Sequence, residues 1–387
     1  MTSRLPGRAR PAGAPRGTKL LWQAWGCVRL HRRAGRPGTG PAHRHRSQEA
    51  YVRFHLILGL AISLACLAFL LRGVDLARLW ELIRQVHLLY YLMVAALLAV
   101  GYWVRSLRWR LLLKPLKDCN LGDLFSANLI GFMANNILPA RLGELVRAYA
   151  ANRLAQVPAS SALATLVIER VLDGMTLLVV LFAALIFADP RAQAGAFNVA
   201  YLRAAGLFLL AAYLGVLAVM AALWRWPQAA TGWLAGLAGR LSPRLGRWGQ
   251  EALTHFTAGL AMLSQARHLP LLLLQSALLW ALSLLAAYLF LPAVGLPLSP
   301  LMAAMVMAGS TLAAAVPSGP GYIGTIQLAM LWALMLAGAD EERATAYAVV
   351  YWAACYFPMT AAGLVEMLRR GLSLGSLRQR AQEAAED

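Results

Sequence analysis

The chain has 387 residues, of which 60% are hydrophobic and only 14% are charged. A soluble domain carries charge on about a quarter of its residues, so this composition excludes a single soluble domain. The net charge of +19 suggests a nucleic-acid ligand, but twelve of the 36 Lys and Arg residues lie within residues 1–53 beside one acid, Glu49. Much of the basicity therefore belongs to one tail, and we expect no nucleic-acid partner.

Residues 1–53 are rich in Arg, Gly, Pro and Ala and show little periodicity. This pattern predicts a disordered basic tail that touches anionic lipid headgroups; a misassigned start codon explains it equally well. No compact apolar stretch with a cleavage site precedes Phe54, so we expect a retained helix from there rather than a secretory signal. The expected parts are the tail 1–53, an integral membrane domain 54–370 and a short cytoplasmic tail 371–387.

Six long apolar runs are candidates for full membrane spans, because about 20 apolar residues cross the hydrocarbon core. They cover residues 54–71, 88–113, 162–187, 204–224, 270–292 and 344–368. Lys and Arg collect at the end of the second run, before the fifth and at the C-terminus, so the positive-inside rule predicts that the connections there and both termini are cytoplasmic.

Two further hydrophobic regions, 121–158 and 298–338, are interrupted near the middle by polar residues, Gly and Pro. The predicted orientation requires each region to enter and leave on the same side of the membrane. We therefore predict an all-α polytopic membrane protein with about six full spans and two opposed broken or re-entrant helical hairpins, about eight hydrophobic segments in total. Secondary transporters use opposed broken elements to bind polar groups near the midplane.

The first broken region contains a dense set of candidate substrate-binding residues: Asn135, Asn136, Pro139, Arg141, Gly143, Glu144 and Arg147. Arg141 and Arg147 are suited to bidentate binding of a phosphate, and Glu144 is placed to orient one of them. Pro139 and Gly143 permit the break in the helix. The alternative is a cytoplasmic loop whose charges are solvated.

The second broken region contains the candidates Pro317, Ser318, Gly319, Gly321, Gly324 and Gln327. Backbone N–H groups freed after Gly321, and the hydroxyls of Ser318 and Thr325, are suited to an anionic or sugar-like group at the N-terminus of the following half-helix. A tight turn between two spanning helices is the alternative.

The third apolar run carries Glu169, Arg170 and Asp173 on neighbouring helix faces, and we expect them to face protein rather than lipid. Either a structural Arg170–Asp173 ion pair or a transport role fits this spacing. We expect Arg105 and Arg108 to extend to the cytoplasmic interface.

Enzyme motifs with established spacing do not occur: the sequence has no HExxH and no phosphate loop ending in GK[ST]. Its four cysteines form no CxxC pair and have no His at metal-ligand spacing. We therefore expect a transporter rather than an enzyme, with no metal, no cofactor and no disulfide.

Three segments in this order resemble the flippase-like membrane domain of lysylphosphatidylglycerol synthases. They are Leu138–Glu144 with Arg147, Glu169–Asp173, and Pro317–Gly324, within a match spanning roughly residues 54–370. The resemblance implies a bacterial inner-membrane protein that moves phospholipids or lipid-linked molecules between leaflets. The soluble aminoacyl-transferring domain of the full synthases is absent, so we do not expect synthesis of lysylphosphatidylglycerol by this chain alone.

Many of these relatives carry Glu where this chain has Gln327, so proton coupling through that position is not expected. We expect a stand-alone lipid flippase whose partners are anionic or phosphate-bearing membrane lipids. The alternative is a membrane enzyme or accessory subunit in a lipid-linked glycan or lipid modification pathway, with a glycosyltransferase or lipid-modifying enzyme as partner.

Overall fold

The computed structural model describes residues 61–70, 72, 75–138, 142–189, 193–194, 197–226, 228–229, 231–233, 236, 269–314 and 318–373. The chain divides into two units, Met1–Val52 and Arg53–Asp387, and all described residues belong to the second unit. Among the candidate site residues, Pro139, Arg141 and Pro317 lie outside the described residues. The predicted basic tail also lies outside them.

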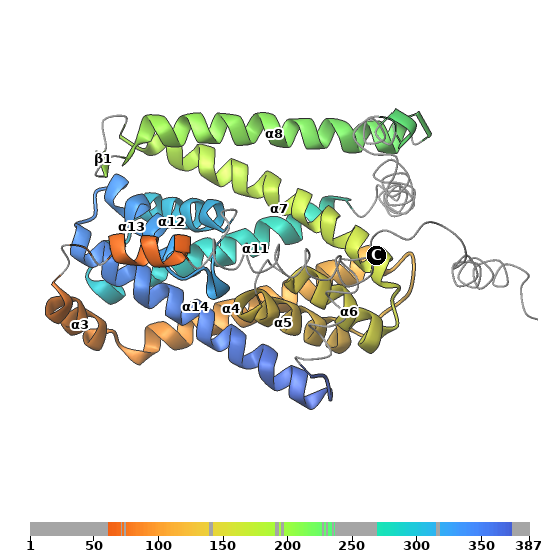
Figure 1. Cartoon of the computed structure of the whole chain (residues 1–387), viewed down its shortest axis with the longest axis horizontal. Coiled ribbons are helices and arrows are strands. Elements are labelled where there is room, and N and C mark those ends of the chain that lie inside the picture. Colours follow the sequence, from red (N-terminus) through yellow and green to blue (C-terminus); the bar gives the residue numbers. More distant parts are fainter. Residues whose placement is uncertain are drawn as a thin grey trace, which may run out of the picture. The chain divides into compact units, whose positions relative to one another are not determined.

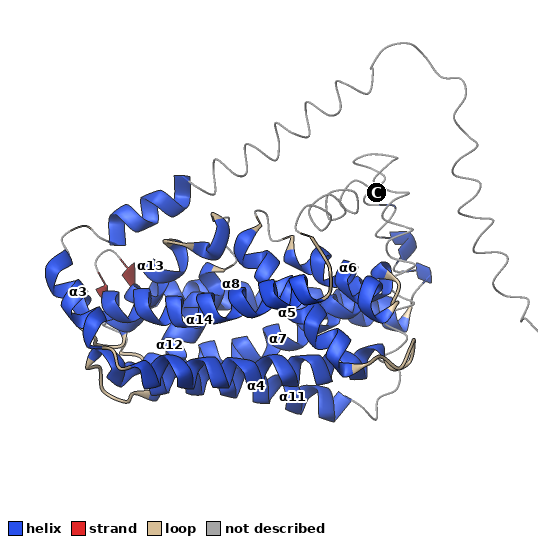
Figure 2. Ribbon diagram, turned by 90° about the horizontal axis from the view of Figure 1, so that it is seen from below, coloured by secondary structure: helices blue, strands red, loops and turns tan. Residues whose placement is uncertain are grey.

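The described part of the chain is helical, which confirms the predicted fold class (Figures 1 and 2). Its labelled helices are α3 (Leu76–Gln85), α4 (Leu88–Leu113), α5 (Leu121–Ile137), α6 (Gly143–Ala155), α7 (Ala159–Phe187), α8 (Val199–Arg225), α11 (Leu269–Phe290), α12 (Pro300–Ala313), α13 (Thr325–Leu336) and α14 (Glu341–Arg369). Shorter elements are the helix Ala61–Leu70, the 3₁₀ turns η4 (Leu291–Val294) and η5 (Pro320–Tyr322), and a two-stranded antiparallel pair, β1 (Gln193–Ala194) with β2 (Phe197–Asn198).

Side-chain caps explain where several helices begin. The carboxylates of Asp75 and Asp340 accept hydrogen bonds from backbone N–H groups in the first turns of α3 and α14. The amide of Asn120 and the hydroxyl of Ser299 do the same for α5 and α12. Such caps satisfy N–H groups that have no partner within the helix, so polar residues in the short connections set the helix starts.

Four described helices are long and apolar enough to cross a membrane: Leu88–Leu113, Ser161–Phe187, Leu269–Val294 and Glu341–Arg369. They coincide with four of the six predicted spans. A fifth predicted span falls on α8, whose 27 residues extend about 40 Å at the usual helical rise. Of the first predicted span, residues 54–71, the structure describes only the helix Ala61–Leu70.

Both interrupted regions fold as helical hairpins, as predicted. The first consists of α5 and α6, separated by residues 138–142, and the second of α12 and α13, separated by residues 314–324. In Figure 1, α5 and α6 lie towards the end of the bundle where α7 begins, and α12 and α13 lie towards the end where α14 begins. The two hairpins are therefore opposed.

One face of α14 contacts the tips of both hairpins. The indole N–H of Trp352 donates to the carbonyl of Gly321 at 3.0 Å, and the amide of Asn136 donates to the hydroxyl of Thr360 at 2.8 Å. Tyr356 lies between these positions and donates to the carbonyl of Asn136 at 3.4 Å. The breaks in the two hairpins therefore lie against a common helix within the bundle.

Candidate functional site

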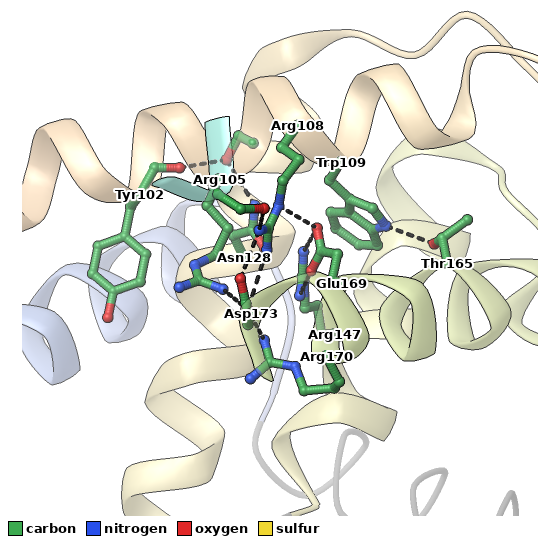
Figure 3. Close-up of polar contacts among 12 residues, drawn as sticks. Tyr102, Arg105, Arg108, Trp109, Asn128, Arg147, Thr165, Glu169, Arg170 and Asp173 are labelled. Carbon is green, nitrogen blue, oxygen red and sulfur yellow. Dashed lines mark hydrogen bonds and ion pairs between the residues drawn. The ribbon is translucent and has the colours of Figure 1, made fainter. Parts of the chain in front are cut away.

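Seven charged side chains from three helices meet inside the bundle, and we call them the charged network; Figure 3 shows all of them except Glu144. They are Arg105 and Arg108 on α4, Glu144 and Arg147 on α6, and Glu169, Arg170 and Asp173 on α7. Within each helix they are spaced one, three or four residues apart, so they project towards the neighbouring helices from adjacent faces. α4 and α7 are membrane-spanning candidates.

Arg108 forms the first tight contact of the network. Its Nη1 lies 2.6 Å from Asp173 Oδ1 and 2.7 Å from the hydroxyl of Ser276 on α11, and its Nη2 lies 3.3 Å from Asp173 Oδ2. The side chain of Arg108 is completely buried. The expectation that Arg108 extends to the interface is wrong, because a carboxylate on α7 holds it inside the bundle.

Arg147 and Glu169 form the second tight contact. Two nitrogens of the guanidinium lie 2.7 and 3.2 Å from the two carboxylate oxygens, a bidentate arrangement. The guanidinium also lies over the ring of Trp109 at 4.1 Å, and the Trp109 indole donates to Thr165 at 2.9 Å. Arg147, Glu169 and Trp109 are all buried, so this contact ties α4, α6 and α7 together.

Three side chains at the edge of the network are less tightly held. The side chains of Arg105, Glu144 and Arg170 are 17%, 32% and 48% exposed. Arg105 and Arg170 lie 3.4 and 3.5 Å from the same oxygen of Asp173, and Arg170 lies 3.9 Å from Glu144. The predicted Arg170–Asp173 pair is present, but the closest partner of Asp173 is Arg108.

The network is not electrically neutral. It combines four guanidinium groups with three carboxylates, which leaves one positive charge in excess when all are ionised. A charge without a counter-ion is costly between spanning helices. An anionic group that reached Arg105 or Arg170 would balance the excess.

The first hairpin break adjoins the network. The Asn135 side chain accepts a hydrogen bond from the N–H of Gly143 at 2.9 Å, which caps the start of α6, and a Cβ at Gly143 would collide with Asn135. Asn136 is held by Thr360 on α14. Glu144 lies 3.9 Å from Arg147, so these two residues are neighbours, as expected.

The second hairpin break is packed against Ala61–Leu70 and α14. The N–H of Gly319 donates to Ser63 at 2.9 Å, and Gly321 and Gly324 both have positive φ, at 71° and 86°. The side chain of Gln327 accepts from the N–H of Gly324 at 2.7 Å and so caps α13. Its position is therefore explained by helix capping.

Ser318 remains as a buried hydroxyl with no hydrogen-bond partner among the described residues. Hydrogen bonds join the second break to Ser63, to Trp352 and to its own Gln327. The tips of both hairpins therefore contact α14. The charged network includes residues of the first hairpin and none of the second.

Arg105, Arg108, Trp109 and Ser276 complete the site beyond the candidates predicted from the sequence. One signal for them was available: two Arg three residues apart within an apolar run require partners of opposite charge. In the part of the chain that the structure describes, Cys66, Cys119 and Cys355 are free thiols, and no group of three His, Cys, Asp or Glu residues is placed to hold a metal.

Known proteins resemble this chain over very different lengths. A UPF0104 membrane protein of Methanothermobacter thermautotrophicus is 25% identical over 332 residues, 81% of this chain and 95% of the relative. UPF0104 membrane protein MJ1595 of Methanocaldococcus jannaschii is 31% identical over 121 residues, 30% of this chain and 35% of the relative. Glycosyltransferase AglD of Haloferax volcanii is 28% identical over 126 residues, 32% of this chain and 20% of the relative. No solved structure matches the chain significantly.

A family model described as "Lysylphosphatidylglycerol synthase TM region" matches residues 56–363. This range includes both helical hairpins and all seven residues of the charged network. The chain is therefore a multi-pass membrane protein that belongs to the lysylphosphatidylglycerol synthase transmembrane-region family.

Proposed function

We propose that this protein is a lipid transporter of the flippase type, which moves a phospholipid or lipid-linked molecule between the leaflets of a bacterial inner membrane. The observation that carries the proposal is the excess positive charge of the network between spanning helices. A soluble anion has little access to that depth, whereas a lipid headgroup reaches it from the bilayer.

The division of the network into tight and loose contacts supports this role. Arg108 and Arg147 are bound at 2.6 and 2.7 Å to buried carboxylates and act as scaffold. Arg105 and Arg170 have longer contacts and partly exposed side chains, so they are free to exchange Asp173 for a phosphate oxygen. An unpaired Arg in the centre of a bilayer costs about 2.5–3.5 kcal/mol on insertion scales, which favours recruitment of an anion.

The opposed hairpins supply the second requirement of a transporter, which is access from two sides. Broken helices at the midplane recur in secondary transporters, where one bundle of helices moves against another. Here the tips of both hairpins are attached to α14 through Gly321 and Asn136. Movement of either hairpin against α14 would alter access to the network.

Arg170→Gln is the variant that tests this role. We expect transbilayer movement of fluorescent phosphatidylglycerol in reconstituted vesicles to slow about tenfold, the factor that corresponds to one lost charge-assisted hydrogen bond. Arg153→Gln is the matched control, because Arg153 lies on α6 and contacts the Tyr149 hydroxyl at 3.0 Å. Equal rates in the wild type and Arg170→Gln, with both proteins folded, would contradict the assignment.

The orientation is part of the same proposal, with the α4–α5 connection and both termini in the cytoplasm. Asp118→Cys and Asp340→Cys, each in a variant whose four native cysteines are replaced by serine, place single reporters in connections at opposite ends of spanning helices. An impermeant maleimide added to intact cells should label Asp340→Cys and leave Asp118→Cys unlabelled until the cells are opened. The reverse pattern would invert the proposed topology.

A membrane enzyme or accessory subunit acting on a lipid-linked glycan is the second candidate, favoured by the similarity of 126 residues to glycosyltransferase AglD. In this role the charged network holds a lipid phosphate for a partner enzyme. Transport by the purified protein alone separates the candidates. A glycosyltransferase that co-purifies, together with vesicles in which no lipid moves, would favour the accessory role.

A further inference from the structure

A cleft with a volume of about 80 Å³ lies between α4 and α11, next to the charged network. The apolar part of its lining includes Leu98, Gly101 and Leu282. The three polar residues of the lining are Tyr102, Arg105 and Ser283. Arg105 is the member of the charged network that lines this cleft. Figure 3 shows Tyr102 beside Arg105 at the edge of the network.

Exposed side chains border the cleft. Ser283 is exposed, and the neighbouring Val100 and Leu285 are 49% and 40% exposed on the two flanking helices. Both α4 and α11 are membrane-spanning candidates, so their exposed apolar surface faces lipid. A lipid molecule therefore has direct lateral access to the cleft.

Arg105 is well placed to meet a headgroup in this cleft. It lies eight residues before the end of α4, about 12 Å along the helix axis. Its guanidinium lies 5.0 Å from the ring of Phe132, and the ring of Tyr102 packs on the same Phe132 at 5.2 Å. Its one hydrogen bond among the described residues is the 3.4 Å contact with Asp173, although a guanidinium carries five N–H donors.

We propose that this cleft is a lateral binding site for a lipid with a singly charged anionic headgroup. The phosphate contacts Arg105 and balances the excess charge of the network, and a segment of an acyl chain lies along Leu98 and Leu282. This inference rests on the proposed transport function and adds to it the substrate charge class and the point of entry.

Gly101 provides a way to fill the cleft without disturbing the bundle. A Cβ at Gly101 would have no atom within 4 Å, so the side chain of Gly101→Leu extends into open space beside the apolar wall. Gly215→Leu on α8 is the matched control, since a Cβ there also has no neighbour within 4 Å and Gly215 does not line the cleft. Arg105→Gln removes the charge and keeps a polar side chain.

The test is photo-crosslinking of the full chain in phosphatidylethanolamine nanodiscs that contain phosphatidylglycerol or phosphatidylcholine with a diazirine on one acyl chain. We expect labelled peptides from α4 and α11, with a preference for phosphatidylglycerol on the order of tenfold. Arg105→Gln should abolish the preference, Gly101→Leu should reduce labelling by both lipids, and Gly215→Leu should label like the wild type.

Equal labelling of α4 and α11 by both lipids in the wild type, or unchanged labelling in Gly101→Leu, would overturn the site. These results distinguish a failure of the proposed binding site from a failure of the proposed transport function. Headgroup-selective labelling together with a complete absence of transbilayer movement would retain the site and reject the transporter. Transport that depends on Arg170 without labelling of the cleft would retain the transporter and reject this point of entry.

Discussion

The guanidinium of Arg108 lies 2.6 Å from the carboxylate of Asp173, and the two residues are 65 positions apart on different helices. Removing one partner of a buried ion pair leaves an uncompensated charge, which costs about 3–5 kcal/mol. We therefore expect Asp173→Asn to lower the free energy of unfolding by this amount. Thermal unfolding in detergent measures the loss.

The exposed pair Arg110–Asp118, at 3.0 Å, is the control for that experiment. Both of its side chains are solvated, so Asp118→Asn should change the free energy of unfolding by at most about 1 kcal/mol. The double variant Arg108→Met with Asp173→Leu removes both charges and should recover part of the lost stability, because Arg105 and Arg170 still lose the carboxylate that they share. A double variant that is less stable than Asp173→Asn would show that the pair itself stabilises the bundle.

The sequence predicts the helices that carry this buried pair, but it does not predict that Arg108 and Asp173 are partners. Apolar runs and Gly/Pro interruptions are local signals, so α4, α7, α11, α14 and the two hairpins follow from the order of residues. The partners of Arg108 are Asp173 and, 168 positions away, Ser276. Contacts at that separation depend on how the helices pack against one another. Local patterns in the sequence do not specify that packing.

Arg147 and Glu144 illustrate the same limit within the predicted site. Their spacing predicts that they are neighbours, and the structure places them 3.9 Å apart. The spacing does not predict that Glu169 binds Arg147 in a bidentate pair or that Trp109 covers its guanidinium. Both of these contacts arise from other helices.

Arg147→Lys should destabilise the protein although the charge is conserved. A lysine ammonium is a point charge that cannot match the two oxygens of Glu169 or stack its plane on Trp109. We expect a loss of about 1.5–3 kcal/mol, the value of a hydrogen bond to a charged group. Arg343→Lys is the control, because Arg343 is half exposed; equal melting temperatures for the two variants would contradict this explanation.

Gly363 should tolerate no side chain. A Cβ at this position of α14 would collide with the Met133 side chain and the Leu129 carbonyl on α5. Overpacking of this kind costs about 1–3 kcal/mol, so Gly363→Ala should lower the melting temperature. Gly215→Ala has open space and should be neutral or stabilising, because alanine has the higher helix propensity. A neutral Gly363→Ala would mean that α5 and α14 adjust their spacing freely.

Trp352 and Trp280 offer a matched test of the contact between α14 and the second hairpin. Trp352 donates to the Gly321 carbonyl at 3.0 Å, whereas the indole N–H of Trp280 is buried with no hydrogen-bond partner among the described residues. Phenylalanine keeps much of the ring and removes the donor in both cases.

Trp352→Phe should therefore cost about 0.5–1.5 kcal/mol, the net value of one intramolecular hydrogen bond, while Trp280→Phe should be neutral or stabilising because it removes an unsatisfied donor. Thermal unfolding of both variants in the same detergent gives the comparison. If Trp352→Phe also alters transbilayer movement and Trp280→Phe does not, the contact with Gly321 controls the position of the second hairpin as well as its stability. Equal destabilisation by the two substitutions would instead assign both effects to lost ring packing, and the hydrogen bond to Gly321 would then have no separate role.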